Sequence, residues 1–237
     1  IPKDQVTPFT MKKLIRLSKS MLPPVLLIAA VLGTIFAGIS PPTEAAAVGC
    51  TAAVLLSIIY KKFSWKMIKT AAVETMKVSA FVVFIAAMSY AFVGIFMNAG
   101  AGDVVAQMIL SVPGGKWASF AVVMLIVFSL GMFIEWIGIV FIVVPIFSII
   151  FAKLGFDPLW AGMMVVVNLQ MAFMTPPMAM SIFVLKGTAP KEYGLTMGDI
   201  IKGVLPFVAI VAIVLVILVI FPEIITWLPD KMIKGVR

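Results

Sequence analysis

The chain has 237 residues, of which 63% are hydrophobic and 12% are charged, with a formal net charge of +8 and no histidine. Its mean hydropathy of +1.20 excludes a soluble enzyme or binding domain, because a domain of this size cannot bury so many apolar side chains. The positive charge therefore fits the Lys/Arg excess of cytoplasmic loops better than nucleic-acid binding. One cysteine, Cys50, excludes an internal disulfide, and the lack of clustered acids and histidines argues against the usual metal enzymes.

The first residues suggest a piece of a longer polypeptide. The chain begins IPKDQVTPFT, without an initiator Met or the apolar core of a signal peptide, so we expect it to continue a preceding segment. A basic stretch at residues 12–19 is either a solvated connector or a helix at the cytoplasmic interface.

Residues 21–39 and 44–60 are predicted to form two membrane spans joined by a turn that contains two prolines. This turn either lies at the far face of the membrane, or the two segments that it joins are the halves of a bent pair of helices. Small residues in the second span favour close helix packing. A second basic segment, residues 61–77, fits a separate helix that lies in the interface with its apolar face down.

Residues 78–97 form the next predicted span, followed by a Gly-rich external loop with a short helix at residues 98–116. The apolar stretch 117–151 is too long for one ordinary span. Gly131 and Gly138 interrupt it. These glycines favour a re-entrant hairpin, in which two half-length helices meet at a glycine-containing tip, over one long tilted helix.

A helix breaker lies inside the apolar segment 159–183. Thr175, Pro176 and Pro177 interrupt it, and two prolines remove two amide donors and clash with the preceding turn. In hydrocarbon such a break is tolerated only where it faces a cavity, a partner or an ion. Secondary transporters build cation and substrate sites from discontinuous helices of this kind, so we predict a transporter. Residues 203–222 form the last predicted span.

Polar groups at membrane depth are the candidates for chemistry. A carboxylate at the bilayer centre costs roughly 2.5–3.5 kcal/mol, so Glu135 should be paired, protonated or facing water. It is either a cation-site or tip-stabilising residue, or it makes a helix-packing hydrogen bond or caps the N-terminus of the returning arm. Asn168 and Gln170 either orient a substrate carboxylate or bridge helices.

The proline break should also expose carbonyl oxygens. Ala172, Phe173 and Met174 lose proline amides as hydrogen-bond donors, and Thr175 adds a hydroxyl. Carbonyl oxygens of unwound helices suit Na⁺, so we predict cation coordination here, with a purely mechanical kink as the alternative. The methionines around the break are more often adaptable packing than a site.

Several sequence runs, in this order, resemble the C-terminal half of the large membrane subunit of the tripartite ATP-independent periplasmic (TRAP) transporters, in the ion transporter superfamily. The runs are PPTEAAAVG, GMFIEWIGIVFIVVPIF, LGFDPLWAG, VVVNLQMAFMTPPMAMSIFVLKGTAP and the ending GVLPFVAI…FPEIITWLP. The resemblance covers nearly the whole chain. It implies an all-α polytopic membrane protein with two inverted repeats, each with a re-entrant hairpin and a Pro-Pro-broken helix. This chain carries only the second repeat.

The resemblance also implies import of small organic acids (carboxylates), driven by a Na⁺ gradient through an elevator-like movement of a transport domain against a scaffold. The implied partners are a small TRAP membrane subunit, a periplasmic substrate-binding protein and the missing N-terminal half of the same subunit. The implied location is the bacterial or archaeal inner membrane, with Na⁺ as coupling ion, no other cofactor and no nucleic acid. A non-translocating structural or channel-like subunit is the alternative.

Carried over by position, the resemblance divides the chain into four parts. They are scaffold and amphipathic arm helices (1–77), a scaffold helix with an external loop (78–116), a transport-domain hairpin with a broken helix (117–187), and a C-terminal transmembrane helix with a tail (188–237). The predicted cation-binding residues are Gly131, Glu135, Ala172, Phe173, Thr175 and Met178, with Na⁺ itself at Gly131, Ala172 and Thr175. The predicted substrate-binding residues are Asn168, Gln170, Thr175 and Pro176. Glu135 stands where the family is expected to carry an aspartate.

Overall fold

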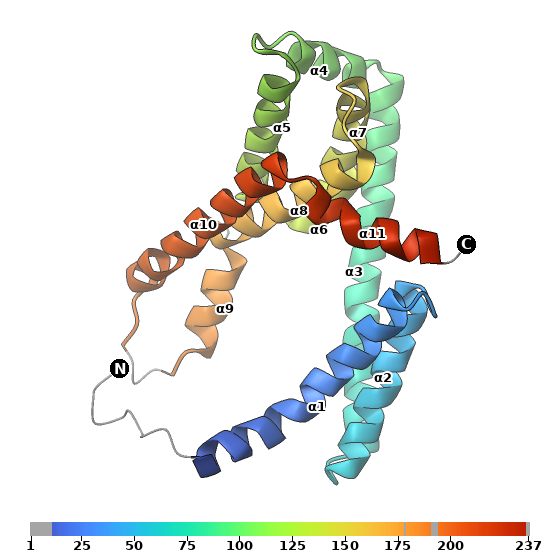
Figure 1. Cartoon of the computed structure of the whole chain (residues 1–237), viewed down its shortest axis with the longest axis vertical. Coiled ribbons are helices and arrows are strands. Elements are labelled where there is room, and N and C mark those ends of the chain that lie inside the picture. The colour runs from blue at the N-terminus through green and yellow to red at the C-terminus, as the bar shows by residue number, and fades with distance from the viewer. Residues whose placement is uncertain (1–10, 178, 191–193, 236–237) are drawn as a thin grey trace. The chain divides into compact units, whose positions relative to one another are not determined.

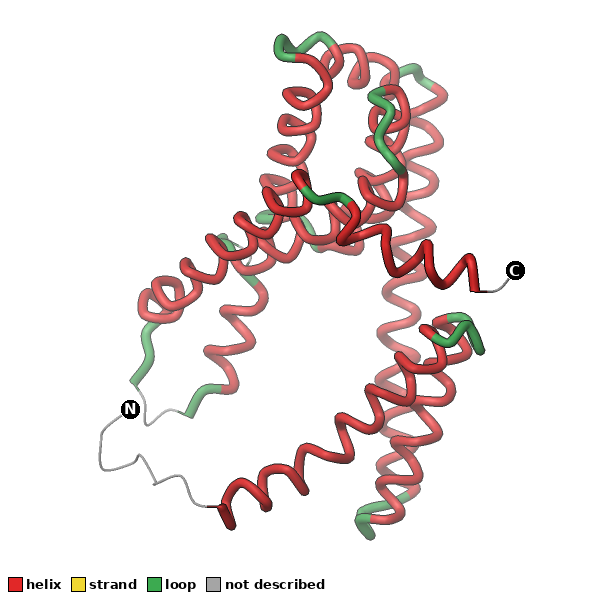
Figure 2. Tube along the Cα trace, in the orientation of Figure 1, coloured by secondary structure: helices red, strands yellow, loops and turns green. Residues whose placement is uncertain are grey.

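The computed structural model describes residues 11–177, 179–190 and 194–235, and within these ranges every regular element is a helix (Figures 1 and 2). The elements are α1 (Met11–Phe36), α2 (Pro42–Ile59), α3 (Trp65–Asn98), α4 (Ala101–Leu110), α5 (Gly115–Gly131), α6 (Trp136–Gly138), the π-helix η2 (Ile139–Val143), α7 (Val144–Lys153), α8 (Pro158–Met174), α9 (Met180–Thr188), α10 (Met197–Ile220) and α11 (Glu223–Gly235). Four described stretches are long and apolar enough to cross a bilayer: α2, α3, Trp136–Lys153 and α10. The predicted all-α polytopic membrane fold is confirmed.

The chain divides into two compact units, Ile1–Glu74 with Asp230–Arg237 and Thr75–Pro229. In the first unit, α1 and α2 pack as a pair joined by the turn at residues 37–41. A Cβ on Gly49 would lie 2.9 Å from Cγ2 of Val31, so the close packing predicted from the small residues of α2 is observed. The basic stretch at residues 12–19 is not a connector, because α1 is helical from Met11 onward.

The predicted separate helix at residues 61–77 is wrong. Residues 65–98 form the single helix α3, which is about 51 Å long at 1.5 Å per residue. The physical reason is visible in the sequence. No proline lies between Trp65 and Asn98, and the first glycine is Gly94, so nothing interrupts the backbone hydrogen bonds where the basic segment meets the apolar one. Residues 98–116 contain the predicted short helix, α4.

Residues 117–151 form a helical hairpin, and not the single tilted helix that was the alternative. The first arm, α5, ends at Gly131, a turn follows at residues 132–135, and the second arm runs as one helical stretch over Trp136–Lys153. The arms fold back on each other, with the rings of Phe120 and Phe151 6.0 Å apart. Each arm is about 26 Å long, which is longer than the predicted half-length helices but short of the full thickness of a hydrocarbon core, about 30 Å.

A π-helical turn within the second arm accommodates a proline. Pro145 has no N–H, and in a regular α-helix its ring would clash with the carbonyl of residue 141. The turn before it, η2, is widened to a π-helix, and Pro145 then occupies the start of α7. The helix continues to Lys153 without a break.

The larger apolar core of the second unit lies between the hairpin and α8. Its buried side chains include Val123 and Val127 of α5, Ile150 of α7, and Met164 of α8. Aromatic rings close the end of this core where α5 begins, with centroids 5.1–6.4 Å apart. The rings are those of Trp117, Phe120, Phe151, Phe156 and Trp160.

The contacts define the directions of three neighbouring helices. Along α5 and α8, Phe120 lies against Trp160 and Gly131 lies against Ala172, so these helices are parallel. In contrast α10 is antiparallel to α8, because Nε1 of Trp160 donates to the carbonyl oxygen of Leu218, 3.0 Å away. The start of α10 packs instead against α9, beyond the level at which the hairpin turns back.

Candidate functional site

The proline break ends α8 at Met174 and restarts the helix at Met180. Thr175 has an extended backbone (φ −103°, ψ 132°), and the Pro176–Pro177 peptide bond is cis. The break therefore lies where the sequence predicts it. Met178 lies outside the described residues, so its predicted role in cation binding has no structural counterpart here.

The carbonyl oxygens at the break are less free than the sequence predicts. The oxygen of Ala172 accepts from the backbone N–H of Thr175 at 3.0 Å, and the oxygen of Phe173 accepts from Oγ of Ser181 at 3.1 Å. The hydroxyl of Thr175 donates to the oxygen of Met171 at 2.8 Å. Each carbonyl oxygen has two lone pairs, so one acceptor position remains on Ala172 and on Phe173.

Ser181 is a residue of the break that the sequence analysis missed. It lies in the first turn of α9 and bridges the two halves of the broken helix through the Phe173 carbonyl. The available signal was a hydroxyl four residues after Pro177, close enough in the chain to donate across the gap that the prolines leave.

Replacing Ser181 by alanine is expected to destabilise the broken helix by about 1 kcal/mol, because the Phe173 carbonyl loses its donor in an apolar environment. Thermal unfolding of the full-length polypeptide in detergent measures the effect. Ser148→Ala is the matched control, since Ser148 is exposed and donates within its own helix, to Pro145. Equal unfolding temperatures for the two variants would contradict the bridging role.

The hairpin tip packs directly on the last turn of α8. A Cβ added to Gly131 would lie 2.7 Å from Cβ of Ala172 and 3.2 Å from Cδ2 of Leu169. Only a residue without a side chain permits this approach of backbones. The structure thus brings together Gly131 and Ala172, two of the three residues predicted to hold Na⁺.

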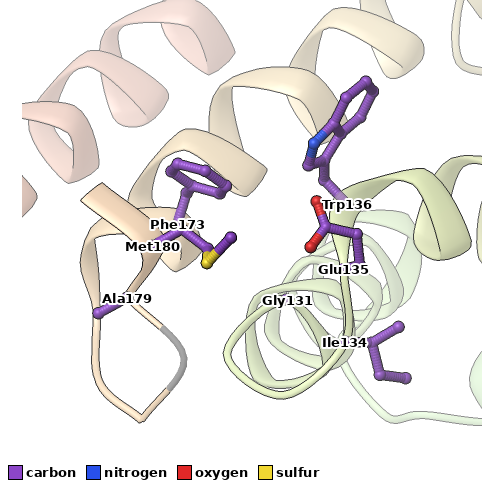
Figure 3. A pocket seen from close by; sticks show the side chains of 7 residues that line it. All are labelled: Gly131, Ile134, Glu135, Trp136, Phe173, Ala179 and Met180. Carbon is purple, nitrogen blue, oxygen red and sulfur yellow. The ribbon is translucent and has the colours of Figure 1, made fainter. Parts of the chain in front are cut away.

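Glu135 is half-buried at the N-cap position of α6, yet its side chain makes no capping hydrogen bond. Among the described residues its carboxylate has no hydrogen-bond or ion-pair partner, so neither the predicted helix-packing hydrogen bond nor the predicted N-cap is observed. In Figure 3 its carboxylate points toward Phe173 and Met180 across the gap between tip and break, whereas Ile134 points away.

A small pocket lies in that gap. Its lining residues are Gly131, Ile134, Glu135, Trp136, Phe173, Ala179 and Met180. The space open to the centre of a water-sized sphere is about 10 Å³, which is the room needed by a single water molecule or a bare ion of similar size. The pocket therefore brings one carboxylate and the two helix interruptions around a volume suited to a small ion.

Four helix ends meet around this pocket. The C-terminal ends of α5 and α8 lie together at Gly131 and Ala172, and each carries a partial negative charge of about half an elementary charge. The N-terminal ends at Trp136 and Met180 also line the pocket, and they carry the opposite partial charge. The first pair of ends favours a cation and the second pair favours an anion.

None of the four predicted substrate residues lines this pocket, and the hydroxyl of one of them, Thr175, donates to Met171 instead. Asn168 is only 1% exposed, and its Nδ2 donates to the carbonyl oxygen of Met124 at 2.7 Å, so it bridges α8 and α5. Gln170 is exposed on another side of α8, and Pro176 is half-buried at the break. Of the two alternatives for Asn168, the structure displays the helix bridge; substrate binding by these three residues stays a prediction.

These features define a class of protein: a polytopic membrane protein in which a helical hairpin abuts a proline-broken helix. The family model described as "Tripartite ATP-independent periplasmic transporter, DctM component" matches residues 3–224. The chain therefore belongs to the DctM family of TRAP transporter permeases, and the resemblance noted in the sequence is confirmed.

Curated relatives are named as TRAP transporter permease proteins. The chain is 28% identical over 205 residues to the sialic acid TRAP transporter permease protein SiaT of Haemophilus influenzae, covering 86% of this chain and 32% of that protein. It is 29% identical over 229 residues to the C4-dicarboxylate TRAP transporter large permease protein DctM of Vibrio cholerae, covering 88% and 50%. It is 30% identical over 181 residues to the isethionate TRAP transporter permease protein DctMQ of Oleidesulfovibrio alaskensis, covering 76% and 28%. The chain thus spans between about a quarter and a half of these relatives.

Proposed function

We propose that this chain forms half of the transport domain, with flanking scaffold helices, of a large permease subunit that imports small organic acids using a Na⁺ gradient. The observation that carries the proposal is the meeting of two helix C-termini at Gly131 and Ala172, with a carboxylate and two helix N-termini around the same small pocket. A cation at the C-termini and the carboxylate of a substrate at the N-termini would each meet complementary charge.

The residues fit a Na⁺ ion by their chemistry. The remaining lone pairs of Ala172 and Phe173, the Thr175 hydroxyl and the Glu135 carboxylate are all oxygen donors. A cation there would tie the hairpin tip to the break, and the ordered pair would then admit substrate, so each ligand would favour binding of the other.

The lengths of the helices support a re-entrant hairpin. The 24 residues of α10 extend about 36 Å, whereas α5 extends about 26 Å from the same end of the bundle. The hairpin turns back at Ala172, and α9 continues for nine more residues, or about 13 Å. The tip would therefore stop within the membrane, as an elevator-type transport domain in the inner membrane requires.

The names of the relatives and of the family indicate which partner proteins to propose. Relatives named as large permease proteins imply a small membrane subunit, and the family description names periplasmic transport. We propose that this chain works with a small TRAP subunit, a periplasmic substrate-binding protein and the rest of its own polypeptide. A non-translocating structural subunit, the alternative, has no need of a broken helix facing a hairpin tip.

The test is substrate uptake by proteoliposomes that hold the full-length large subunit with its small subunit and binding protein. Uptake is expected to require both the binding protein and an inward Na⁺ gradient, and to stop when K⁺ replaces Na⁺. Uptake that persists in K⁺ but follows a proton gradient would overturn Na⁺ coupling and make Glu135 the first proton carrier to examine. The absence of uptake with every gradient would favour the structural alternative.

Thr175→Ala and Glu135→Gln are each expected to raise the Na⁺ concentration for half-maximal uptake by about tenfold or more, since a ligand to a charged group contributes about 1.5–3 kcal/mol. Thr188→Ala is the matched control. Thr188 also donates to the carbonyl four residues earlier, but at the exposed end of α9. An unchanged Na⁺ response in both test variants would show that the cation binds elsewhere.

A further inference from the structure

A second, larger cavity of about 420 Å³ lies open between the helices α5, α8 and α10. We call it the lateral groove. Its lining includes Trp117, Met124, Phe128, Asn168, Met171 and Val216. Asn168 is the only lining side chain with an amide or a charge, and its N–H is already bonded to Met124. The groove therefore fits an apolar occupant.

The dimensions of the lateral groove match one leaflet of a bilayer. Along α5 it extends from Trp117 to Phe128, eleven residues or about 16 Å. Half of a hydrocarbon core is about 15 Å. Side chains at its rim are exposed, with 63% of Leu125 and 59% of Val216 accessible, so the groove opens sideways. A single extended acyl chain has this shape.

One end of the lateral groove carries a cation. Nζ of Lys116 lies 5.4 Å from the ring centroid of Trp117, which lines the groove, and 5.3 Å from that of Phe156. Lys116 has no ion-pair partner among the described residues. Lysine and tryptophan are the side chains that anchor proteins at the level of the lipid headgroups. A phosphate at this end would meet an ammonium group, while the acyl chain below it meets only apolar walls.

The methionines of the groove also suit a flexible apolar occupant. Met124, Met164 and Met171 line it, and the thioether side chain adapts to a flexible partner better than branched residues do. We propose that the lateral groove binds one phospholipid of the surrounding bilayer, with an acyl chain between α5, α8 and α10 and its phosphate at Lys116. The site lies apart from the ion pocket, and it does not depend on the proposed transport function.

Native mass spectrometry of the purified full-length polypeptide, stripped in detergent and titrated with phosphatidylglycerol, tests the proposal. We expect one phospholipid to be retained by the wild type. Val216→Trp fills the groove and is expected to weaken retention at least tenfold. Ile210→Trp is the matched control, because Ile210 is 55% exposed on the same helix and lies outside the groove. Ala121→Phe, in the α5 wall, repeats the test if Val216→Trp does not fold.

A separate experiment tests the contact between Lys116 and the phosphate of the headgroup. Lys116→Gln is expected to weaken phosphatidylglycerol binding about fivefold, or about 1 kcal/mol, and to leave binding of diacylglycerol, which has no phosphate, unchanged. Equal lipid retention by the wild type and the groove-filling variants would overturn the proposal. So would a wild-type protein that retains no lipid, since the rest of the polypeptide would then occupy the groove.

Discussion

Replacing Gly131 by alanine is expected to lower both the stability of the protein and the Na⁺-driven uptake proposed for it. The added Cβ would lie 2.7 Å from Cβ of Ala172, a separation that real side chains do not adopt, so the hairpin tip must move away from the break. Overpacking of this kind costs about 1–3 kcal/mol. Thermal unfolding in detergent and uptake by proteoliposomes, measured on the same preparation, report the two effects.

Two controls separate local overpacking from a general effect of losing a glycine. Gly162 also lies in a helix, but a Cβ there has no atom within 4 Å, so Gly162→Ala is expected to preserve or slightly raise stability. Adding Ala172→Gly to the Gly131→Ala variant removes the atom that the new methyl group strikes, and uptake should recover. Wild-type stability and uptake in Gly131→Ala would show that the tip and the break do not meet.

Asn168→Asp is expected to be the most destabilising of the substitutions considered, at about 3 kcal/mol or more. The side chain is 1% exposed, and its Nδ2 donates to the Met124 carbonyl at 2.7 Å. An aspartate would replace this donor by a buried charge facing an acceptor, or would have to take up a proton. The free energy cost appears as a lower unfolding temperature, and as a smaller fraction of folded protein after extraction in detergent.

Asn168→Leu separates the two roles considered for this side chain. Leucine has a similar volume, and the Met124 carbonyl lies within α5 and keeps its helical hydrogen bond, so the cost should be about 1 kcal/mol. If Asn168 only bridges helices, this variant will transport normally once folded. A variant that unfolds at the wild-type temperature but takes up no substrate would instead assign Asn168 to substrate binding.

The interruptions of the helices follow from local chemistry. The adjacent prolines Pro176 and Pro177 follow the end of α8, because their nitrogens cannot donate hydrogen bonds. The adjacent prolines Pro23 and Pro24 lie inside α1 without ending it, so the surroundings also decide whether such a pair breaks a helix. A stretch of about 35 apolar residues with glycines near its middle folds back on itself for a similarly local reason. The same reasoning fails at residues 61–77, where a change of composition was taken for a helix boundary. Charge alone does not end a helix when no proline or glycine is present.

The sequence by itself therefore determined the membrane class, the family and the positions of the hairpin turn and the helix break. Those features were predicted from hydropathy and from the backbone properties of glycine and proline, although the Pro-Pro pair inside α1 shows that such a pair does not by itself end a helix. Only the tertiary structure decided that Gly131 meets Ala172, that Ser181 satisfies the Phe173 carbonyl and that Asn168 faces α5. The contact between Asn168 and Met124 joins residues 44 positions apart. Such contacts arise from the packing of whole helices, and no local sequence pattern specifies them.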